Sequence, residues 1–187
     1  MNTRCYVALL RGINVGRAKR IAMADLRKVI GDLGFTEVRS LLNSGNVVFM
    51  GPKATHKEVR RAIEEALVMK LGVPSRVTVL DSEELAQVVA DNPLADSADD
   101  HSRLLVFFLT RPRDHALLEP LPAKDWGDEQ LALGRRAAYI CCPAGILQCR
   151  AGAAVGTELG DATTSRNWST VLKLHALCET VKAAAAA

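Results

Sequence analysis

Short apolar runs and amphipathic stripes alternate along the first half of the chain, and their order limits the folds it can adopt. A run at 6–10 precedes a stripe at 26–33 in which apolar residues recur every three or four positions, the spacing of one helix face. Two β-favouring runs follow at 38–42 and 47–49. Asn43–Asn46 between them tolerate the positive φ of a tight turn, so we expect an antiparallel hairpin.

A second helical stripe follows the hairpin at 59–67. Thr55 and Glu58 have the spacing of a capping box before it, and Gly72 provides a C-terminal stop. A β-favouring run at 76–80 predicts a fourth strand. The resulting order buries two helices against one face of a four-stranded sheet. We therefore predict an α+β fold that begins with a ferredoxin-like βαββαβ module.

The chain is expected to divide into two domains. Asp81 and Glu84 have capping-box spacing and predict a third helix after the fourth strand. The polar stretch at 96–100 that follows this helix is the candidate linker. We predict a ferredoxin-like domain at 1–95 and a second α+β domain with a C-terminal helix at 96–187. With 49% hydrophobic residues, the chain can bury two cores of that size.

The second half repeats the order strand, helix, strand, strand, helix in looser form. The expected strands lie at 104–109, 130–133 and 137–142, the helices at 113–119 and 147–159, and a final helix begins near Asn167. No residue-level repeat relates the two halves, so a duplication is an architectural hypothesis. The terminal alanines at 183–187 are expected to fray.

Charge and aromatic content argue against a dedicated nucleic-acid binder. The formal net charge is +3, with +4 in residues 1–95 and −1 in residues 96–187. This positive excess is smaller than that of a dedicated nucleic-acid binder, which carries a strongly basic surface. An RNA-binding sheet of the βαββαβ order stacks bases on aromatic side chains of its central strands. Here those strands offer only Tyr6 and Phe49, so the stacking platform is missing.

No apolar stretch reaches the roughly 18 residues of a membrane span, and no signal peptide is recognisable at the start of the sequence. We therefore predict a cytoplasmic protein. Its five cysteines are expected to be reduced thiols there. Cys141, Cys142 and Cys149 lack the spacing of a structural zinc site, so no metal site is predicted, and no motif indicates a cofactor.

The loop after the first strand carries the strongest functional signal. Residues 10–20 hold two glycines, Gly12 and Gly16, and four cations, among them Arg11 and Arg17. Backbone N–H groups of such a loop can hold a phosphate or carboxylate. The loop is neither a Walker motif nor a dinucleotide-binding fingerprint, and solvated cations on a purely structural loop remain the alternative.

Two further segments are candidates for the same site. Ser44, Gly45 and Asn46 could place a hydroxyl and an amide beside the loop, although these residue types also serve simple turns. Asn167 is expected to cap the last helix, which leaves Arg166 to reach solvent or an anion. No histidine is recognisably paired with a serine, so no nucleophile and base are assigned.

Three segments together resemble the signature of domain-of-unknown-function family 1697, a group of uncharacterised bacterial proteins. They are Leu9–Gly16, Ser44–Phe49 and Thr164–Val171. The resemblance implies an α+β fold of ferredoxin-like character, a bacterial source and a cytoplasmic protein without a stated activity. It directs attention to a surface made by Arg11, Gly12, Asn14, Gly16, Ser44, Gly45, Asn46, Arg166 and Asn167. Where the family pattern usually has Ser-Lys, this chain has Cys149-Arg150, which keeps the positive charge and loses the hydroxyl.

The function expected from these features is binding of an anionic small ligand, phosphate- or carboxylate-bearing, at a composite loop site. Two alternatives stay open. One is an enzyme acting on a phosphorylated small molecule, for which no general base is evident. The other is a module for protein interaction or oligomerisation, whose protein partner the sequence does not indicate.

Overall fold

A computed structural model describes residues 3–15 and 19–187, and its chain divides into two compact units. The first unit contains residues Met1–Leu85 and Lys173–Ala187, and the second contains Ala86–Leu172. Two of the helices, one after the fourth strand and one at the C-terminus, run from one unit into the other. Among the described residues, no helix is both long and apolar enough to cross a bilayer.

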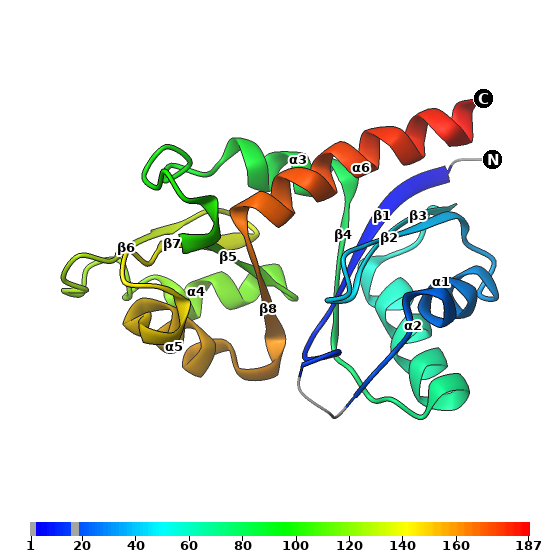
Figure 1. Ribbon diagram of the computed structural model, residues 1–187, viewed down its shortest axis with the longest axis horizontal. Coiled ribbons are helices and arrows are strands. Elements are labelled where there is room, and N and C mark those ends of the chain that lie inside the picture. The colour runs from blue at the N-terminus through cyan, green and yellow to red at the C-terminus, as the bar shows by residue number, and fades with distance from the viewer. Residues whose placement is uncertain (1–2, 16–18) are drawn as a thin grey trace. The chain divides into compact units, whose positions relative to one another are not determined.

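The first unit has the predicted βαββαβ order (Figure 1). Its elements are β1 (Thr3–Leu10), α1 (Met23–Gly31), β2 (Thr36–Leu41), β3 (Asn46–Pro52), α2 (His56–Leu71) and β4 (Val77–Asp81). The strands lie in the order β2-β3-β1-β4 with every neighbouring pair antiparallel. This is the ferredoxin-like arrangement, so the predicted fold class is confirmed for this unit.

The core of the first unit contains every second residue of β1, because alternate side chains of a strand point to the same face. Tyr6, Ala8 and Leu10 share one face of the strand and pack with apolar residues of α1 and α2. The intervening residues are also buried, and among them Cys5 lies within hydrogen-bonding reach of Cys178 in the C-terminal helix. The sheet is thus covered on both faces, which explains why β1 reads as a continuous apolar run and not as an alternating one.

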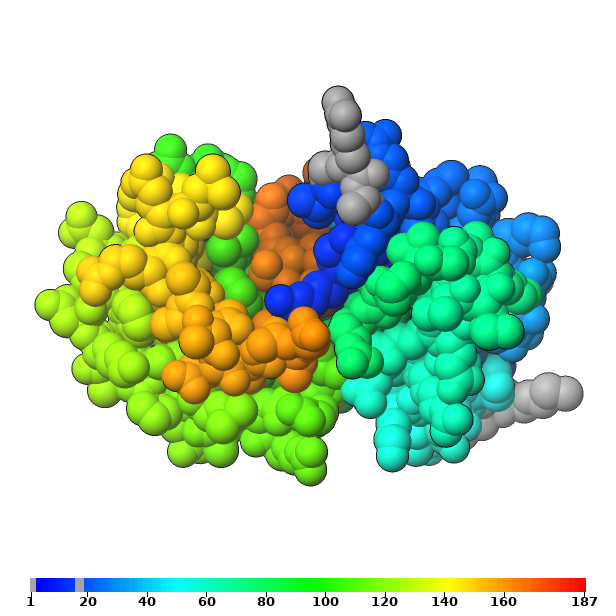
Figure 2. All heavy atoms as spheres, turned by 90° about the horizontal axis from the view of Figure 1, so that it is seen from below, coloured from blue at the N-terminus to red at the C-terminus, as the bar shows by residue number. Residues whose placement is uncertain are grey.

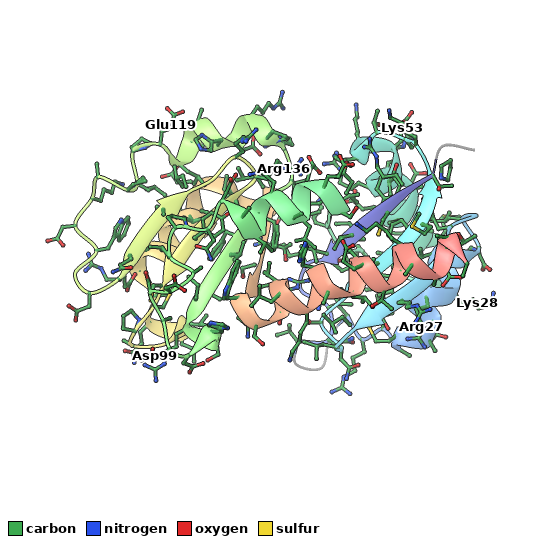
Figure 3. The ribbon with its side chains drawn as sticks, turned by 90° about the horizontal axis from the view of Figure 1, so that it is seen from above. Arg27, Lys28, Lys53, Asp99, Glu119 and Arg136 are labelled. Atoms are coloured by element: carbon green, nitrogen blue, oxygen red, sulfur yellow. A yellow bond between two sulfur atoms is a disulfide. The ribbon has the colours of Figure 1, made fainter. Side chains whose placement is uncertain are left out.

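Polar side chains connect helix α1 and the residue after it to β2 and α2. Arg27 donates a hydrogen bond of 2.6 Å to the hydroxyl of Ser40 in β2, and Lys28 pairs with Asp32 at 3.0 Å. Figure 3 labels both basic side chains where they project from α1. Lys70 of α2 contacts the same Asp32 carboxylate at 2.8 Å, and the two ammonium groups lower the pKa of this carboxyl.

The boundaries of α2 are those that the sequence predicts. The Thr55 hydroxyl accepts a hydrogen bond from the Glu58 N–H, and the Glu58 carboxylate accepts one from the Thr55 N–H. Gly72 ends the helix with a φ of 65°. Figure 2 shows α2, in cyan to green, on the near side of this unit.

Replacing the N-cap is expected to destabilise this helix measurably. Thr55→Ala removes the acceptor for the Glu58 N–H, so the free energy of unfolding should fall by about 1 kcal/mol. Urea unfolding followed by far-UV circular dichroism measures the change, and Thr55→Ser is the matched control because it keeps the hydroxyl. Equal losses for the two variants would contradict a capping role.

The second unit forms a second sheet of the same topology. Its elements are β5 (Leu104–Leu109), α4 (His115–Leu118), β6 (Gln130–Leu133), β7 (Ala137–Cys141), α5 (Arg150–Leu159) and β8 (Thr163–Asn167), with short 3₁₀ turns at His101–Arg103, Pro112–Asp114, Ile146–Gln148 and Gly160–Ala162. The strand order β6-β7-β5-β8 matches that of the first sheet position by position. The second unit begins within α3 (Ser82–Ala90) and ends within α6 (Trp168–Ala186).

Three expectations for the second half are wrong. The sequence did not indicate β8, whose five residues are polar, so the order is βαββαβ and not βαββα. The alanines at 183–186 remain helical at the end of α6. Cys142 and Cys149 form a disulfide, with 5.6 Å between their Cα atoms, where reduced thiols were expected. Their separation of seven residues is bridged because the chain turns back through the Ile146–Gln148 3₁₀ turn.

Candidate functional site

Asn14 organises the loop that follows β1. Its φ is 57°, in the left-handed region that asparagine tolerates better than most residues. Its side-chain amide donates to the carbonyl oxygens of Ile21 (3.0 Å) and Asn43 (2.6 Å), while its Oδ1 accepts from the Ile21 N–H at 2.9 Å. One side chain therefore closes the loop and joins it to the hairpin turn.

The hairpin turn lies against the same loop. The Leu10 N–H donates to the Gly45 carbonyl oxygen at 2.8 Å. Asn46 is fully buried, and its amide donates to the Leu41 carbonyl oxygen at 3.0 Å and to the Ser44 hydroxyl at 2.9 Å. The structure thus brings the first two predicted segments together at one end of the first sheet.

A pocket of about 460 Å³ opens between the loop, the turn and the start of α1. The residues that line it are Asn14, Arg20, Ile21, Ala22, Met23 and Asn43. The described lining contains no histidine, cysteine or carboxylate, so it offers one cation and several amide dipoles. That composition suits an anion better than a metal ion.

The N-terminus of α1 lies at this pocket. Ala22 is the N-cap residue, and among the described residues no side chain caps the helix. The first N–H groups of a helix lack intrahelical partners and carry a partial positive charge. Ala22 and Met23 lie in the pocket lining beside Arg20, whereas Asp25 in the first turn adds an opposing negative charge.

The other predicted residues of the loop do not line the pocket as far as they are described. Arg11 donates its N–H to the Arg76 carbonyl oxygen, and its own carbonyl oxygen accepts from the Ser75 hydroxyl at 3.0 Å. Gly12 has a φ of 67° and is exposed. Gly16 and Arg17 lie outside the described residues. Of the lining residues, the sequence singled out only Asn14 as a site residue and counted Arg20 among the four cations of the loop. It missed Ile21, Ala22, Met23 and Asn43, although the hairpin turn and the start of α1 were both foreseeable.

Arg166 and Asn167 belong to β8 in the second unit. The Arg166 guanidinium donates to the Thr164 hydroxyl at 2.8 Å and to the Ser165 carbonyl oxygen at 2.7 Å. Burial lowers its pKa to about 10, so it stays charged at neutral pH. Asn167 accepts a hydrogen bond from the Thr170 N–H at 2.9 Å and thereby caps α6, as the sequence predicts.

Comparisons with known proteins give a family and a fold. The family model described as "Protein of unknown function (DUF1697)" matches residues 2–139. Among solved structures, the chain is similar to conserved bacterial protein SP0830 from Streptococcus pneumoniae, with a TM-score of 0.78 and 22% sequence identity. The similarity covers 95% of this chain and 99% of that one, and it supports the fold alone. No curated protein matches the sequence.

Proposed function

The chain belongs to the DUF1697 family, and we propose that it binds a phosphate- or carboxylate-bearing small ligand in the pocket of the first unit. The description of the family assigns no activity. The observation that carries the proposal is the uncapped start of α1 beside Arg20 in the pocket lining. Backbone N–H groups at the N-terminus of a helix commonly bind anions, and a nearby guanidinium strengthens such binding.

Binding is favoured over catalysis by the chemistry of the lining. Asparagine amides, backbone N–H groups and a guanidinium orient and neutralise an anion. The described lining contains no histidine, cysteine or carboxylate that could act as a general base. The side-chain amide of Asn14 is held in place by hydrogen bonds to the backbone of Ile21 and Asn43, so this part of the pocket is preformed.

A thermal-shift screen tests this proposal directly. Nucleotides, sugar phosphates, coenzyme A derivatives and dicarboxylates are compared at one fixed ionic strength, since a ligand that binds the native state raises the melting temperature. Arg20→Ala should weaken binding of any hit about tenfold, the loss expected for one charged hydrogen bond. Asp25→Asn should strengthen it slightly because it removes the opposing charge in the first turn.

Arg113→Ala is the matched control, because it removes an exposed arginine from the second unit. Arg11→Ala, Arg166→Ala and Asn167→Ala belong in the same assay, since the sequence predicts these residues as ligand-binding. A panel without any shift would overturn the proposal and favour an interaction module. A hit that Arg20→Ala leaves unchanged would overturn the assignment to this pocket.

A further inference from the structure

We propose that His56, Asp81 and Glu84 form a binding site for a divalent transition-metal ion, with Zn²⁺ as the best geometric match. His56 is the first residue of α2, Asp81 is the last residue of β4, and Glu84 lies in the first turn of α3. One ligand atom from each residue lies within 4.8 Å of the others. All three residues belong to the first unit, and none lines the proposed anion pocket.

The distances fit a tetrahedral ion. The Nε2 atom of His56 lies 3.3 Å from Glu84 Oε2 and 3.6 Å from Asp81 Oδ2. With zinc bonds of about 2.0–2.2 Å, tetrahedral geometry separates neighbouring ligand atoms by roughly 3.3–3.6 Å. An ion could therefore sit between these atoms with little movement of the side chains. Three protein ligands would leave one position for water.

The histidine nitrogen supplies an independent indication. Nε2 is inaccessible to solvent and makes no hydrogen bond within the described residues, although the Asp81 and Glu84 carboxylates lie at ion-pair distance and the side chain as a whole is 27% exposed. Buried polar atoms in native proteins are nearly always paired, and an orphan commonly marks an unseen water or ion. A metal ion would occupy the lone pair of a neutral imidazole at this point.

The two carboxylates are already oriented as a metal site requires. Asp81 Oδ1 accepts from the Glu84 N–H at 2.9 Å, and Glu84 Oε2 accepts from the Asp81 N–H at 3.1 Å. Arg4 contacts Asp81 Oδ2 at 2.9 Å. Hydrogen-bonded outer partners of this kind hold ligating carboxylates in position. Two carboxylates against one arginine leave a net negative charge, which a divalent cation would offset.

The imidazole of His56 is held in place by its surroundings. The His56 ring is packed edge-on against Tyr6, with 6.4 Å between ring centroids. The Tyr6 hydroxyl in turn bonds the backbone of Ala54 just before α2, which limits movement of the imidazole.

A simpler arrangement uses the same atoms without a metal. A protonated His56 would form ion pairs with both carboxylates. The two arrangements require opposite states of the imidazole, because a metal ligand has to be neutral. The metal ion and the ion pairs therefore exclude each other at the same imidazole nitrogen.

Isothermal titration of the chelator-treated full chain with Zn²⁺ tests the site. We expect saturable binding of one ion, weakened at least a hundredfold by His56→Ala. Glu84→Gln should weaken it about tenfold. This variant retains a side-chain oxygen for the Asp81 N–H, and an unchanged circular dichroism spectrum would show that the fold is intact.

His115→Ala is the matched control. His115 Nδ1 lies 3.6 Å from Glu119 Oε1 in the second unit, so this histidine also has a carboxylate neighbour. Among the described residues, it does not belong to a group of three potential metal ligands. Its loss should leave zinc affinity unchanged. The proposal is overturned by the absence of saturable binding, or by binding that survives both His56→Ala and Glu84→Gln. Zinc held by cysteine thiols would give the second of these results.

Discussion

Gly45→Ala is expected to lower the free energy of unfolding of the first unit by about 3 kcal/mol. Gly45 has a φ of 77°, which costs an alanine about 1 kcal/mol or more. A Cβ atom there would lie 2.7 Å from Leu10 Cβ and 2.8 Å from Ile13 Cδ1. Both neighbours are fully or almost fully buried, so the clash would be relieved only by moving the core.

Gly12→Ala separates the two contributions to this effect. Gly12 has a similar φ of 67°, but a Cβ atom at this position would meet no atom of residues 3–15 or 19–187 within 4 Å. Its replacement should therefore cost only the conformational part, about 1 kcal/mol. Urea unfolding followed by far-UV circular dichroism compares the two variants. Equal losses would show that packing around Gly45 adapts without cost.

Breaking the Cys142–Cys149 disulfide is expected to lower the stability of the second unit by about 2.5 kcal/mol. The bond closes a short loop, and its removal gives the unfolded chain more conformational freedom. Both sulfurs are buried between β7 and the start of α5, where Cys149 also accepts a hydrogen bond from the Gly152 N–H at 3.4 Å. Loss of the bond would thus also loosen the N-cap of α5.

Tryptophan fluorescence reports this change selectively, because Trp126 and Trp168 both lie in the second unit. Unfolding curves are measured with and without dithiothreitol. The double variant Cys142→Ala, Cys149→Ala should not respond to reductant, and it should be less stable than the reduced protein because it also removes the sulfur that caps α5. Superimposable curves for the oxidised and reduced wild type would contradict a stabilising bond.

Local patterns in the sequence were sufficient for most of the helices and strands. Thr55 and Gly72 mark both ends of α2 because capping depends on residues within one turn. Strand β6 occupies the predicted residues, and β5 does so as well. Strand β8 was missed because Thr163–Asn167 is polar, and it becomes a strand through its antiparallel pairing with β5. The domain division at residue 95 and the cytoplasmic location stay predictions.

The sequence predicted the separate segments of the candidate site but not the contacts between them. The sequence by itself determined the glycine-containing loop, the hairpin turn and the helix start, because each depends on backbone preferences of a few consecutive residues. Only the tertiary structure decided that Asn14 reaches Asn43, that Cys142 bonds Cys149, and that His56 meets Asp81. The reason is physical: these contacts depend on strand order and on the direction of the chain, which no local pattern encodes.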